Sequence, residues 1–347
     1  MKHPLTLFLL FIFPFSIFSQ KTDTSRAAQF REIGNVYFNS KLYQKAIEKY
    51  TKAIEVNSLD KGSYYLRGKC YASTDKTEEG LKDLNKAIAI DKNFSEAYFS
   101  RAILKSEYMK DFDGALADYG QCIRLAPASA NVYIMRGRLE FFMKQYEAAI
   151  ADFTKSISID PAFPTPSADA YNGRAYCYYY LGNYVKALAD FNKVSESPLK
   201  YNILYNRCLS KRKTGDMKGA LSDINELIQY DPSIDSAYIE QGYLRFKSGD
   251  TLGAYQSYSK CLQLNPNRIS CYYNRALVLM AMKQYKKAIE DLYVVLTYNP
   301  RDALALGNRG IARRESGDLA GACKDMQEAY SITPDMEMED WLKKYCR

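Results

Sequence analysis

Apolar positions along this chain repeat with a period of about 34 residues, and the pattern gives nine units, starting at residues 27, 61, 95, 130, 168, 201, 235, 269 and 303. Within each unit, small residues at position eight, and in most units also at position twenty, are flanked by apolar residues at three- and four-residue spacing. This spacing predicts two amphipathic helices per unit that cross closely at the small residues. Position eight holds Gly34, Gly68, Ala102, Gly137, Ala175, Cys208, Gly242, Ala276 and Gly310.

Turns and prolines mark the ends of the predicted helices. A polar turn such as KQY or TGD separates the two predicted helices, and a proline follows the second helix in most units, as at Pro127 and Pro300. Three departures from the period occur: one residue is added in the turn of the third unit, around residues 109–113; four are inserted as PTPS at 164–167; and the fifth unit is one residue short.

The pattern resembles the tetratricopeptide repeat, whose motif has aromatic residues at positions four, eleven and twenty-four and small residues at eight, twenty and twenty-seven. The first unit matches this motif with Phe30, Gly34, Tyr37, Ala46, Tyr50 and Ala53. The resemblance spans residues 27–336 and implies an all-α fold, a right-handed superhelical solenoid of about nine helix-turn-helix units. The predicted units are 27–60, 61–94, 95–129, 130–163, 168–200, 201–234, 235–268, 269–302 and 303–336, after a signal peptide at 1–19 and a linker at 20–26, and before a capping helix at 337–347.

Position eleven departs from the family motif. Charged residues replace the aromatic there, so we expect looser packing in the units concerned. The substituted positions are Lys105, Glu140, Lys211, Arg245 and Arg313.

Two charged positions vary together across the units. Seven units carry arginine at position seven, and the same seven carry aspartate at position twenty-three once the added residue of the third unit is allowed for; the first and seventh units lack both. This covariation predicts ion pairs that fasten the two helices of one hairpin, in preference to a ligand site, because a charge held by an internal partner is poorly available to an outside one. The predicted pairs are Arg67 with Asp83, Arg101 with Asp118, Arg136 with Asp152, Arg174 with Asp190, Arg207 with Asp223, Arg275 with Asp291, and Arg309 with Asp325.

The first twenty residues, MKHPLTLFLLFIFPFSIFSQ, differ from the rest of the chain. A basic start precedes an apolar run from Leu5 to Phe18, and small Ser19 follows, which is typical of a signal peptide cut after residue 19. An uncleaved anchor is the alternative, but about 14 apolar residues are fewer than the roughly 20 needed to cross a bilayer. The Phe-rich core ending in FSQ resembles exported proteins of Bacteroidota and implies the periplasm, the cell surface or secretion.

Composition disfavours several functions. The chain's only histidine, His3, lies in the signal segment, so the mature chain has no imidazole for catalysis or metal binding. The net charge of +8 is spread along the chain and does not favour nucleic acid. No glycine-rich phosphate loop occurs. We therefore expect no enzyme, no cofactor, no metal site and, after signal cleavage, no integral membrane segment, although peripheral association with the envelope stays open.

The family resemblance implies that the first helices line a concave groove through positions two, five, nine, twelve and thirteen. Read at these positions, the groove is aromatic, which suits a protein or peptide partner because such side chains bury area at low entropic cost. The alternative is that a chain with 31 tyrosines places many of them on every surface. The candidate binding residues are Arg138, Phe141, Phe142, Asn172, Tyr176, Tyr179, Tyr180, Tyr205, Tyr243, Phe246 and Tyr273.

One known specificity of the family can be tested. Family members that clamp the C-terminal carboxylate of cytosolic chaperones use basic and Asn residues in three successive units. Arg31 and Asn35 fit the first pair, but Leu66, Glu96 and Ser100 break the remainder. We therefore do not expect that ligand.

Eight cysteines are consistent with an oxidising compartment. Cys122, Cys208 and Cys261 occupy small-residue packing positions and are interpreted as buried thiols. Cys323 and Cys346 are a candidate disulfide that fastens the capping helix.

The sequence thus favours an exported, non-catalytic scaffold that holds a protein or peptide segment in its groove. The alternatives are an envelope glycan-binding factor, since aromatic side chains also stack on sugar rings, and a structural protein that associates with itself.

Overall fold

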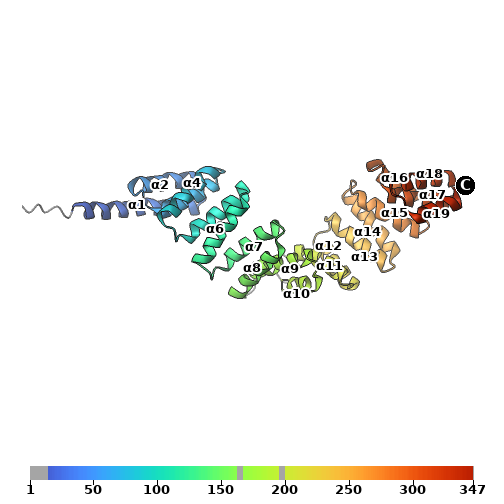
Figure 1. Ribbon diagram of the computed structural model, residues 1–347, viewed down its shortest axis with the longest axis horizontal. Helices are drawn as coiled ribbons and strands as arrows, with labels where there is room; N and C mark the ends of the chain where they lie inside the picture. The colour runs from blue at the N-terminus through green and yellow to red at the C-terminus, as the bar shows by residue number, and fades with distance from the viewer. Residues whose placement is uncertain (1–14, 162–166, 195–199, 347) are drawn as a thin grey trace, which may run out of the picture. The chain divides into compact units, whose positions relative to one another are not determined.

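The computed structural model describes residues 15–161, 167–194 and 200–346, and within these ranges every regular element is a helix (Figure 1). The predicted signal segment lies mostly outside them. The helices are α1 (Phe15–Asn39), α2 (Tyr43–Val56), α3 (Lys61–Ala72), α4 (Thr77–Ile90), α5 (Ser95–Leu104), a π-helix η1 (Lys105–Met109), α6 (Phe112–Leu125), α7 (Ala130–Phe142), α8 (Tyr146–Ile159), α9 (Ser167–Tyr180), α10 (Tyr184–Lys193), α11 (Lys200–Lys213), α12 (Met217–Tyr230), α13 (Asp235–Lys247), α14 (Thr251–Leu264), α15 (Ile269–Ala281), α16 (Tyr285–Tyr298), α17 (Ala303–Glu315), α18 (Leu319–Ile332) and α19 (Met336–Tyr345).

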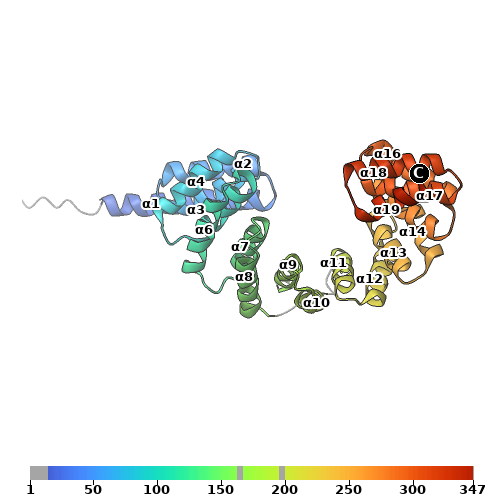
Figure 2. The ribbon, with the colours of Figure 1, turned by 45° about the vertical axis from the view of Figure 1, so that its right-hand side comes forward.

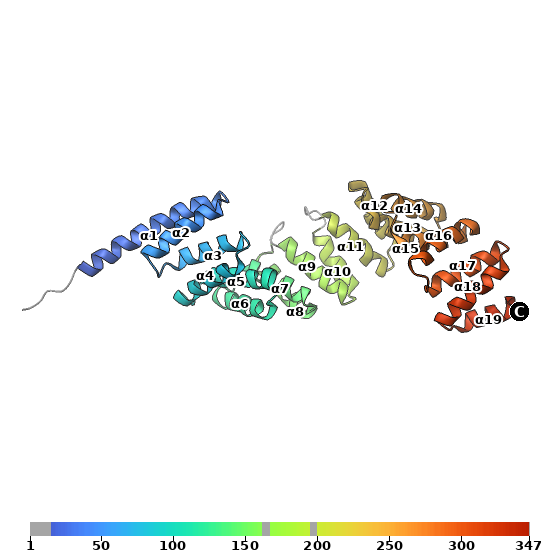
Figure 3. The ribbon, with the colours of Figure 1, turned by 90° about the horizontal axis from the view of Figure 1, so that it is seen from above.

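Successive helices form hairpins, and within each compact part of the chain the hairpins pack on their neighbours in sequence. Contacts are densest within the pairs α1/α2, α3/α4 and so on, and the second helix of one hairpin also packs on the first helix of the next. Figure 3 shows α1 and α2 side by side. The chain divides into two compact halves, here called the N-terminal half (to Gly173) and the C-terminal half (from Arg174).

The helix boundaries follow local signals. Aspartate or asparagine side chains cap several second helices, as where Asp216 accepts from the amide of Gly219 at the start of α12. Glycines with positive φ, such as Gly215 at 88°, form the turns before these helices. The first helices α3, α5, α7, α13, α15 and α17 begin at residues 61, 95, 130, 235, 269 and 303, where the sequence repeats begin.

The two helices of a hairpin approach so closely that only small residues fit at their crossing. A Cβ atom added to Gly34 would lie 2.5 Å from the ring of Tyr50, which is completely buried. In the fourth repeat the ring of Phe153 lies between Gly137 of its own hairpin and Gly173 of the next repeat, where an added Cβ would lie 2.5 Å away. Each hairpin is therefore interlocked by a large ring on its second helix and a missing side chain opposite it.

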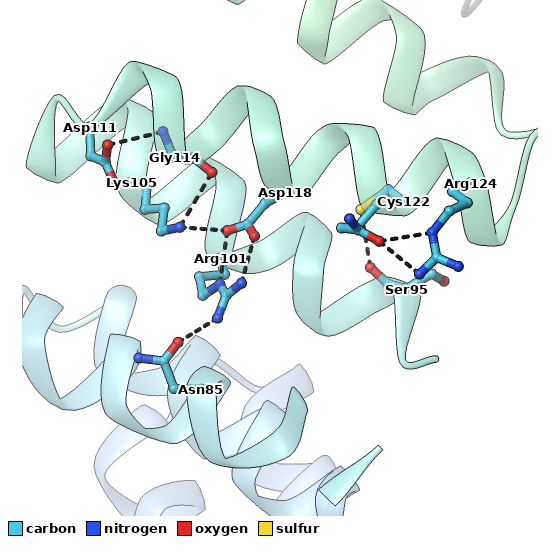
Figure 4. A network of polar contacts seen from close by, with 10 residues as sticks. Asn85, Ser95, Arg101, Lys105, Asp111, Gly114, Asp118, Cys122 and Arg124 are labelled. Carbon is cyan, nitrogen blue, oxygen red and sulfur yellow. Dashed lines mark hydrogen bonds and ion pairs between the residues drawn. The ribbon is translucent and has the colours of Figure 1, made fainter. Parts of the chain in front are cut away.

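Arginine at position seven and aspartate at position twenty-three meet in all seven repeats that carry them. Arg101 donates from Nε and Nη2 to the two carboxylate oxygens of Asp118, at 2.8 and 2.6 Å (Figure 4). The other six pairs share this bidentate geometry at 2.6–2.9 Å, and every aspartate is at most 5% exposed.

Some of these arginines also donate a hydrogen bond to the preceding repeat, a contact that was not predicted from the sequence. Arg67 donates from Nη1 to Thr51, and Arg101 donates from Nη1 to Asn85, at 2.9 and 2.6 Å. In the seventh repeat Gln241 takes the place of the arginine: it accepts from Ser257 in its own hairpin and donates to Asn225 in the preceding one. This polar position therefore links a hairpin internally and to its neighbour.

Where a cation stands at position eleven, it makes polar contacts that were not predicted. Lys105 forms an ion pair with Asp118 at 3.0 Å and donates to the carbonyl of Gly114 (Figure 4). Lys211 and Arg313 contact the aspartate and a second-helix carbonyl of their own repeats in the same way, and Arg245 donates to Ser257 and to the carbonyl of Gly253. Hydrogen bonds replace the ring, because a long cationic side chain can reach the carboxylate that the arginine already holds.

Glu140 is the anionic exception at position eleven. Its side chain is buried and lies beside the pair formed by Arg136 and Asp152, with its Oε1 3.9 Å from Arg136 Nε. Its buried Oε2 has no hydrogen-bond partner. Burial, followed by the nearby carboxylate of Asp152, raises the pKa of Glu140 to about 7.

The added residue of the third repeat was expected in the turn between the two helices, and this expectation is wrong. The residue lies within the last turn of the first helix, which widens into the π-helix η1 at residues 105–109. The turn that follows keeps the form of its equivalents: Lys110 has φ 56°, as Lys144 has φ 61° in the fourth repeat.

Replacing Asp118 by Asn is expected to lower the free energy of unfolding by about 3 kcal/mol, because two cations then lose their buried counter-charge. Urea denaturation measures the difference. The matched control is Asp113→Asn, an exposed position on the same helix. Equal effects of the two substitutions would show that the ion pair contributes no stability.

Glu140→Gln is expected to stabilise the protein at pH 8 by about 1–2 kcal/mol. A folded-state pKa of about 7, above the ordinary 4.5, means that the folded chain binds the proton more tightly than the unfolded chain does. The stability this proton supplies is present below pH 4.5 and is lost as the pH rises to 7. Denaturation of both proteins at pH 4.5 and 8 tests this; a pH-independent difference, or the same behaviour in exposed Glu147→Gln, contradicts it.

Candidate functional site

Side chains of three successive first helices gather in the C-terminal half. Tyr179 comes from α9, Tyr205 and Arg212 from α11, and Glu240 and Tyr243 from α13. We call these five residues the tyrosine–arginine cluster. All five are partly exposed, so the cluster forms a surface and not a closed core.

The charged pair at the centre of this cluster is not fully hydrogen-bonded. Arg212 Nε lies 3.4 Å from Glu240 Oε2, and both atoms are buried without a hydrogen-bond partner. The guanidinium lies over the ring of Tyr243, 4.9 Å from its centroid. Burial raises the pKa of Glu240, and the positive charge of Arg212 opposes this rise. The pair therefore keeps hydrogen-bonding capacity that the protein itself does not satisfy.

Tyr179 and Tyr205 of the cluster stay protonated over the physiological range, because the pKa of each is raised. Burial, followed by the carboxylate of Glu240, raises the pKa of Tyr205 to about 12. Burial likewise raises the pKa of Tyr179. The cluster therefore offers hydroxyl groups and ring faces around one partly exposed cation and one partly exposed anion, an arrangement suited to recognition. Glu240 was not among the residues predicted from sequence, because position six is not an inner-face position of the family motif.

Several predicted groove residues serve packing between repeats. The hydroxyl of Tyr176 accepts from Asn206 Nδ2 at 2.8 Å, and the hydroxyl of Tyr273 accepts from Asn308 Nδ2 at 3.0 Å. Phe246 packs against the buried cluster around Tyr258. By contrast, the side chain of Tyr180 is 59% exposed.

The predicted residues of the N-terminal half lie on α7 and α9. Arg138 forms an ion pair with Asp169 at 3.0 Å, and its side chain remains 51% exposed. Phe142 is 68% exposed, whereas Phe141 packs on Tyr146 with ring centroids 5.6 Å apart. The buried Oδ1 of Asn172 has no hydrogen-bond partner.

The cysteines separate into two disulfides and buried thiols. Cys323 and Cys346 are bonded and join α18 to the residue that ends α19. The interpretation of Cys261 as a buried thiol is wrong: it forms a disulfide with Cys271, because the second helix of one repeat places it next to the first helix of the following one. The remaining cysteines are buried thiols, and burial raises the pKa to about 12 at Cys70, Cys122 and Cys208.

The terminal helix α19 covers the last hairpin and lies beside α17 and α18 (Figure 2). Arg314 of α17 lies over the ring of Tyr345 at 4.5 Å and over that of Trp341 at 5.7 Å. Met338 lies 3.7 Å from the position of a Cβ on Gly307. No residue of α19 is fully buried, so the disulfide carries much of its attachment.

Two kinds of feature are missing from the residues described. Among them, no group of three or more His, Cys, Asp or Glu side chains is placed to hold a metal ion. Within the same ranges, no helix combines the length and the apolarity needed to cross a membrane.

Comparison with protein families gives one consistent result. Two family models, both described as tetratricopeptide repeat, match the chain over more than half its length. One matches residues 32–58, 62–94, 130–163, 168–198 and 235–268, and the other matches residues 273–337.

Curated relatives match only part of the chain. Hsp70-Hsp90 organizing protein 3 of Arabidopsis thaliana is 32% identical over 105 residues, which are 30% of this chain and 19% of that protein. Serine/threonine-protein phosphatase 5 of Homo sapiens is 33% identical over 102 residues, 29% of this chain and 20% of that protein. The similarity therefore spans about a fifth of these relatives.

Solved structures show the same fold at lower identity. The C-terminal part of a TPR repeat-containing protein from Cytophaga hutchinsonii has a TM-score of 0.60 at 20% identity and covers 70% of this chain and 98% of its own. A tetratricopeptide repeat protein from Parabacteroides merdae has a TM-score of 0.53 at 19% identity, with 73% and 99% covered.

Cys346→Ser is expected to loosen the terminal helix, because the disulfide closes a segment of 23 residues and contributes about 3 kcal/mol to its attachment. Trp341 is the only tryptophan, so its fluorescence reports on α19 alone and should shift to longer wavelength. The double variant Cys261→Ser/Cys271→Ser is the control and should leave this emission unchanged. An unaltered spectrum for Cys346→Ser would show that side-chain contacts alone hold the helix.

Proposed function

The chain belongs to the tetratricopeptide repeat family, and from this premise we propose that it is a non-catalytic scaffold that binds a segment of a protein partner on the inner face of its first helices. The tyrosine–arginine cluster is the observation that carries the proposal. Its rings and hydroxyl groups surround a charged pair whose buried Nε and Oε2 atoms lack partners.

A peptide backbone or a polar side chain suits such a surface. The Nε and Oε2 atoms themselves are buried, so a ligand contacts the cluster through its hydroxyl groups, its ring faces and the exposed parts of the charged side chains. Tyrosines add contact area with few rotatable bonds to immobilise. The exposed ring of Tyr180 and the exposed cations Lys213 and Lys247 extend this surface at position thirteen of the same three helices.

We do not propose for this chain the chaperone binding that the names of the relatives indicate. Arg31 and Asn35 match the first part of the carboxylate-clamp pattern, but both are engaged internally. Arg31 forms an ion pair with Asp60, and Asn35 accepts a hydrogen bond from the hydroxyl of Tyr50 at 2.9 Å. These contacts support a different partner.

We place the protein outside the cytoplasm, in the periplasm or at the cell surface. The apolar segment of residues 1–19 has the layout of a signal peptide. Two disulfides, Cys261–Cys271 and Cys323–Cys346, suit an oxidising compartment.

A surface variant tests the proposal in cells. Tyr180→Ser, Lys213→Ser and Lys247→Ser together alter the exposed edge of the cluster without removing a buried group. Crosslinking followed by mass spectrometry should capture a specific partner with the wild-type protein, and the triple variant should reduce its recovery at least about tenfold, as expected when several interface contacts are lost.

The control variant changes the same residue types on α16, at the exposed residues Tyr298, Lys286 and Lys287. It should retain the partner. Equal loss in both variants would point to general surface effects, and full retention in both would place the binding surface elsewhere. Capture of further copies of this chain alone would indicate self-association.

A further inference from the structure

The π-helix η1 at residues 105–109 is a local departure from the repeat. Among the described residues it is the only π-helix. The repeats on either side end their first helices with α-helical turns, and the turn after η1 is normal. The added residue therefore changes only the last turn of one inner-face helix.

An added residue of this kind lowers the stability of the helical turn and widens it. A π-helical turn is wider than an α-helical turn, is less stable, and is frequently found at functional sites. The widened turn adjoins a cavity of about 520 Å³ in the N-terminal half, between the third and fourth repeats. We call this cavity the π-pocket.

The walls of the π-pocket are largely aromatic. Phe112 from α6 and Phe142 from α7 meet edge to face, with centroids 5.3 Å apart, and Tyr119 and Met135 also line the cavity. Phe142 is 68% exposed, so most of its ring is uncovered. Ring faces and a methionine sulfur favour an aromatic occupant, since offset ring contacts and sulfur–aromatic contacts add to the burial of area.

One cation at the π-pocket, Lys110, is available to an anion beside that ring, whereas Arg138 is already paired with Asp169. Lys110 and Arg138 line it with one carboxylate, that of Glu107. Lys110 is exposed, and Arg138 keeps 51% of its side chain exposed beside Asp169. Lys105 lies in η1 but is directed to Asp118 and is not available at the rim.

We propose that the π-pocket receives one aromatic side chain of a partner segment that carries a carboxylate on an adjacent residue. The ring enters between Phe112, Phe142 and Met135, and the carboxylate meets Lys110. This inference rests on the proposed scaffold function and adds a second contact point with a stated chemistry. The added residue of the third repeat is then what opens the pocket.

Deleting one residue should change the pocket and leave the repeat fold intact. Aligned with the fourth repeat, Glu107 corresponds to Phe142 and Met109 to Met143, so Tyr108 is the surplus residue. Tyr108 is 50% exposed and does not line the pocket. Its removal restores the ordinary repeat length, converts η1 to an α-helical turn and should raise the thermal midpoint while narrowing the pocket.

The probes are blocked hexapeptides that contain 5-fluorotryptophan. GSDWSG carries the proposed pair of residues, and GSKWSG reverses the charge. Broadening of the peptide's fluorine NMR signal measures binding without interference from the protein. We expect GSDWSG to bind with a dissociation constant of about 1 mM or better, in the range available to one buried side chain with an ion pair. GSKWSG should bind at least about fivefold more weakly, since like charges then meet.

The deletion of Tyr108 and the substitution Phe142→Ala should each weaken GSDWSG binding at least about tenfold, while Tyr293→Ala, at an exposed ring of the C-terminal half, should not. Phe142→Ala removes an exposed ring, so it keeps the test valid if the deletion impairs folding. Unchanged binding in a folded Phe142→Ala protein, no binding to the wild-type protein at 1 mM, or equal binding of the two peptides overturns the proposal.

These outcomes are independent of the proposed function. If cellular crosslinking captures a partner equally with wild-type and Phe142→Ala proteins, the π-pocket is not used although the scaffold function stands. If the wild-type protein captures none, the scaffold function fails while the peptide titration still decides whether the pocket selects an acidic aromatic segment.

Discussion

The close crossing of two helices within each hairpin is the constraint on which the rest of this structure depends. A buried ring on the second helix occupies the space that a side chain at position eight would need, as Tyr50 does at Gly34 and Phe153 at Gly137. Hairpins built in this way are thin, so each one exposes apolar faces that only its neighbours can cover. The order of the repeats along the chain thereby becomes their order in space within each half.

The buried aspartates are a consequence of that crossing. An isolated carboxylate this well buried would be strongly destabilising, so it requires a partner with matching geometry. The planar fork of arginine supplies two donors to the carboxylate and still has a third for the preceding repeat, as Arg101 shows with Asn85. Lysine could not make all three contacts, because its donors share one nitrogen atom and cannot span the carboxylate and the neighbouring repeat. The one link therefore fixes both the hairpin and its register against the hairpin before it.

The sequence was sufficient to predict what repeats, and it was insufficient where a single repeat differs. The helical hairpins and the pairing of arginine with aspartate follow from positions that recur, since each recurrence is an independent observation of the same contact. The polar contacts at position eleven were not predicted, because a motif that asks for an aromatic says nothing about the hydrogen bonds a cation such as Lys211 makes in its place. The Cys261–Cys271 disulfide was missed because it joins two repeats, and a within-repeat comparison cannot reveal such a contact.

The candidate site was harder to predict for a related physical reason. Inner-face positions serve both packing and recognition, and only the surroundings separate the two roles: Tyr176 and Tyr273 use their hydroxyls to join repeats, whereas Tyr180 remains largely exposed. Because each hairpin contacts only its neighbours, one repeat can change without disturbing the others. The added residue of the third repeat alters a single helical turn, and the partly buried Glu240 in the seventh changes the charge of one patch. In a scaffold of this kind, positions that follow the repeat maintain the fold, and positions that break it without impairing the packing are where a specific partner is most readily accommodated.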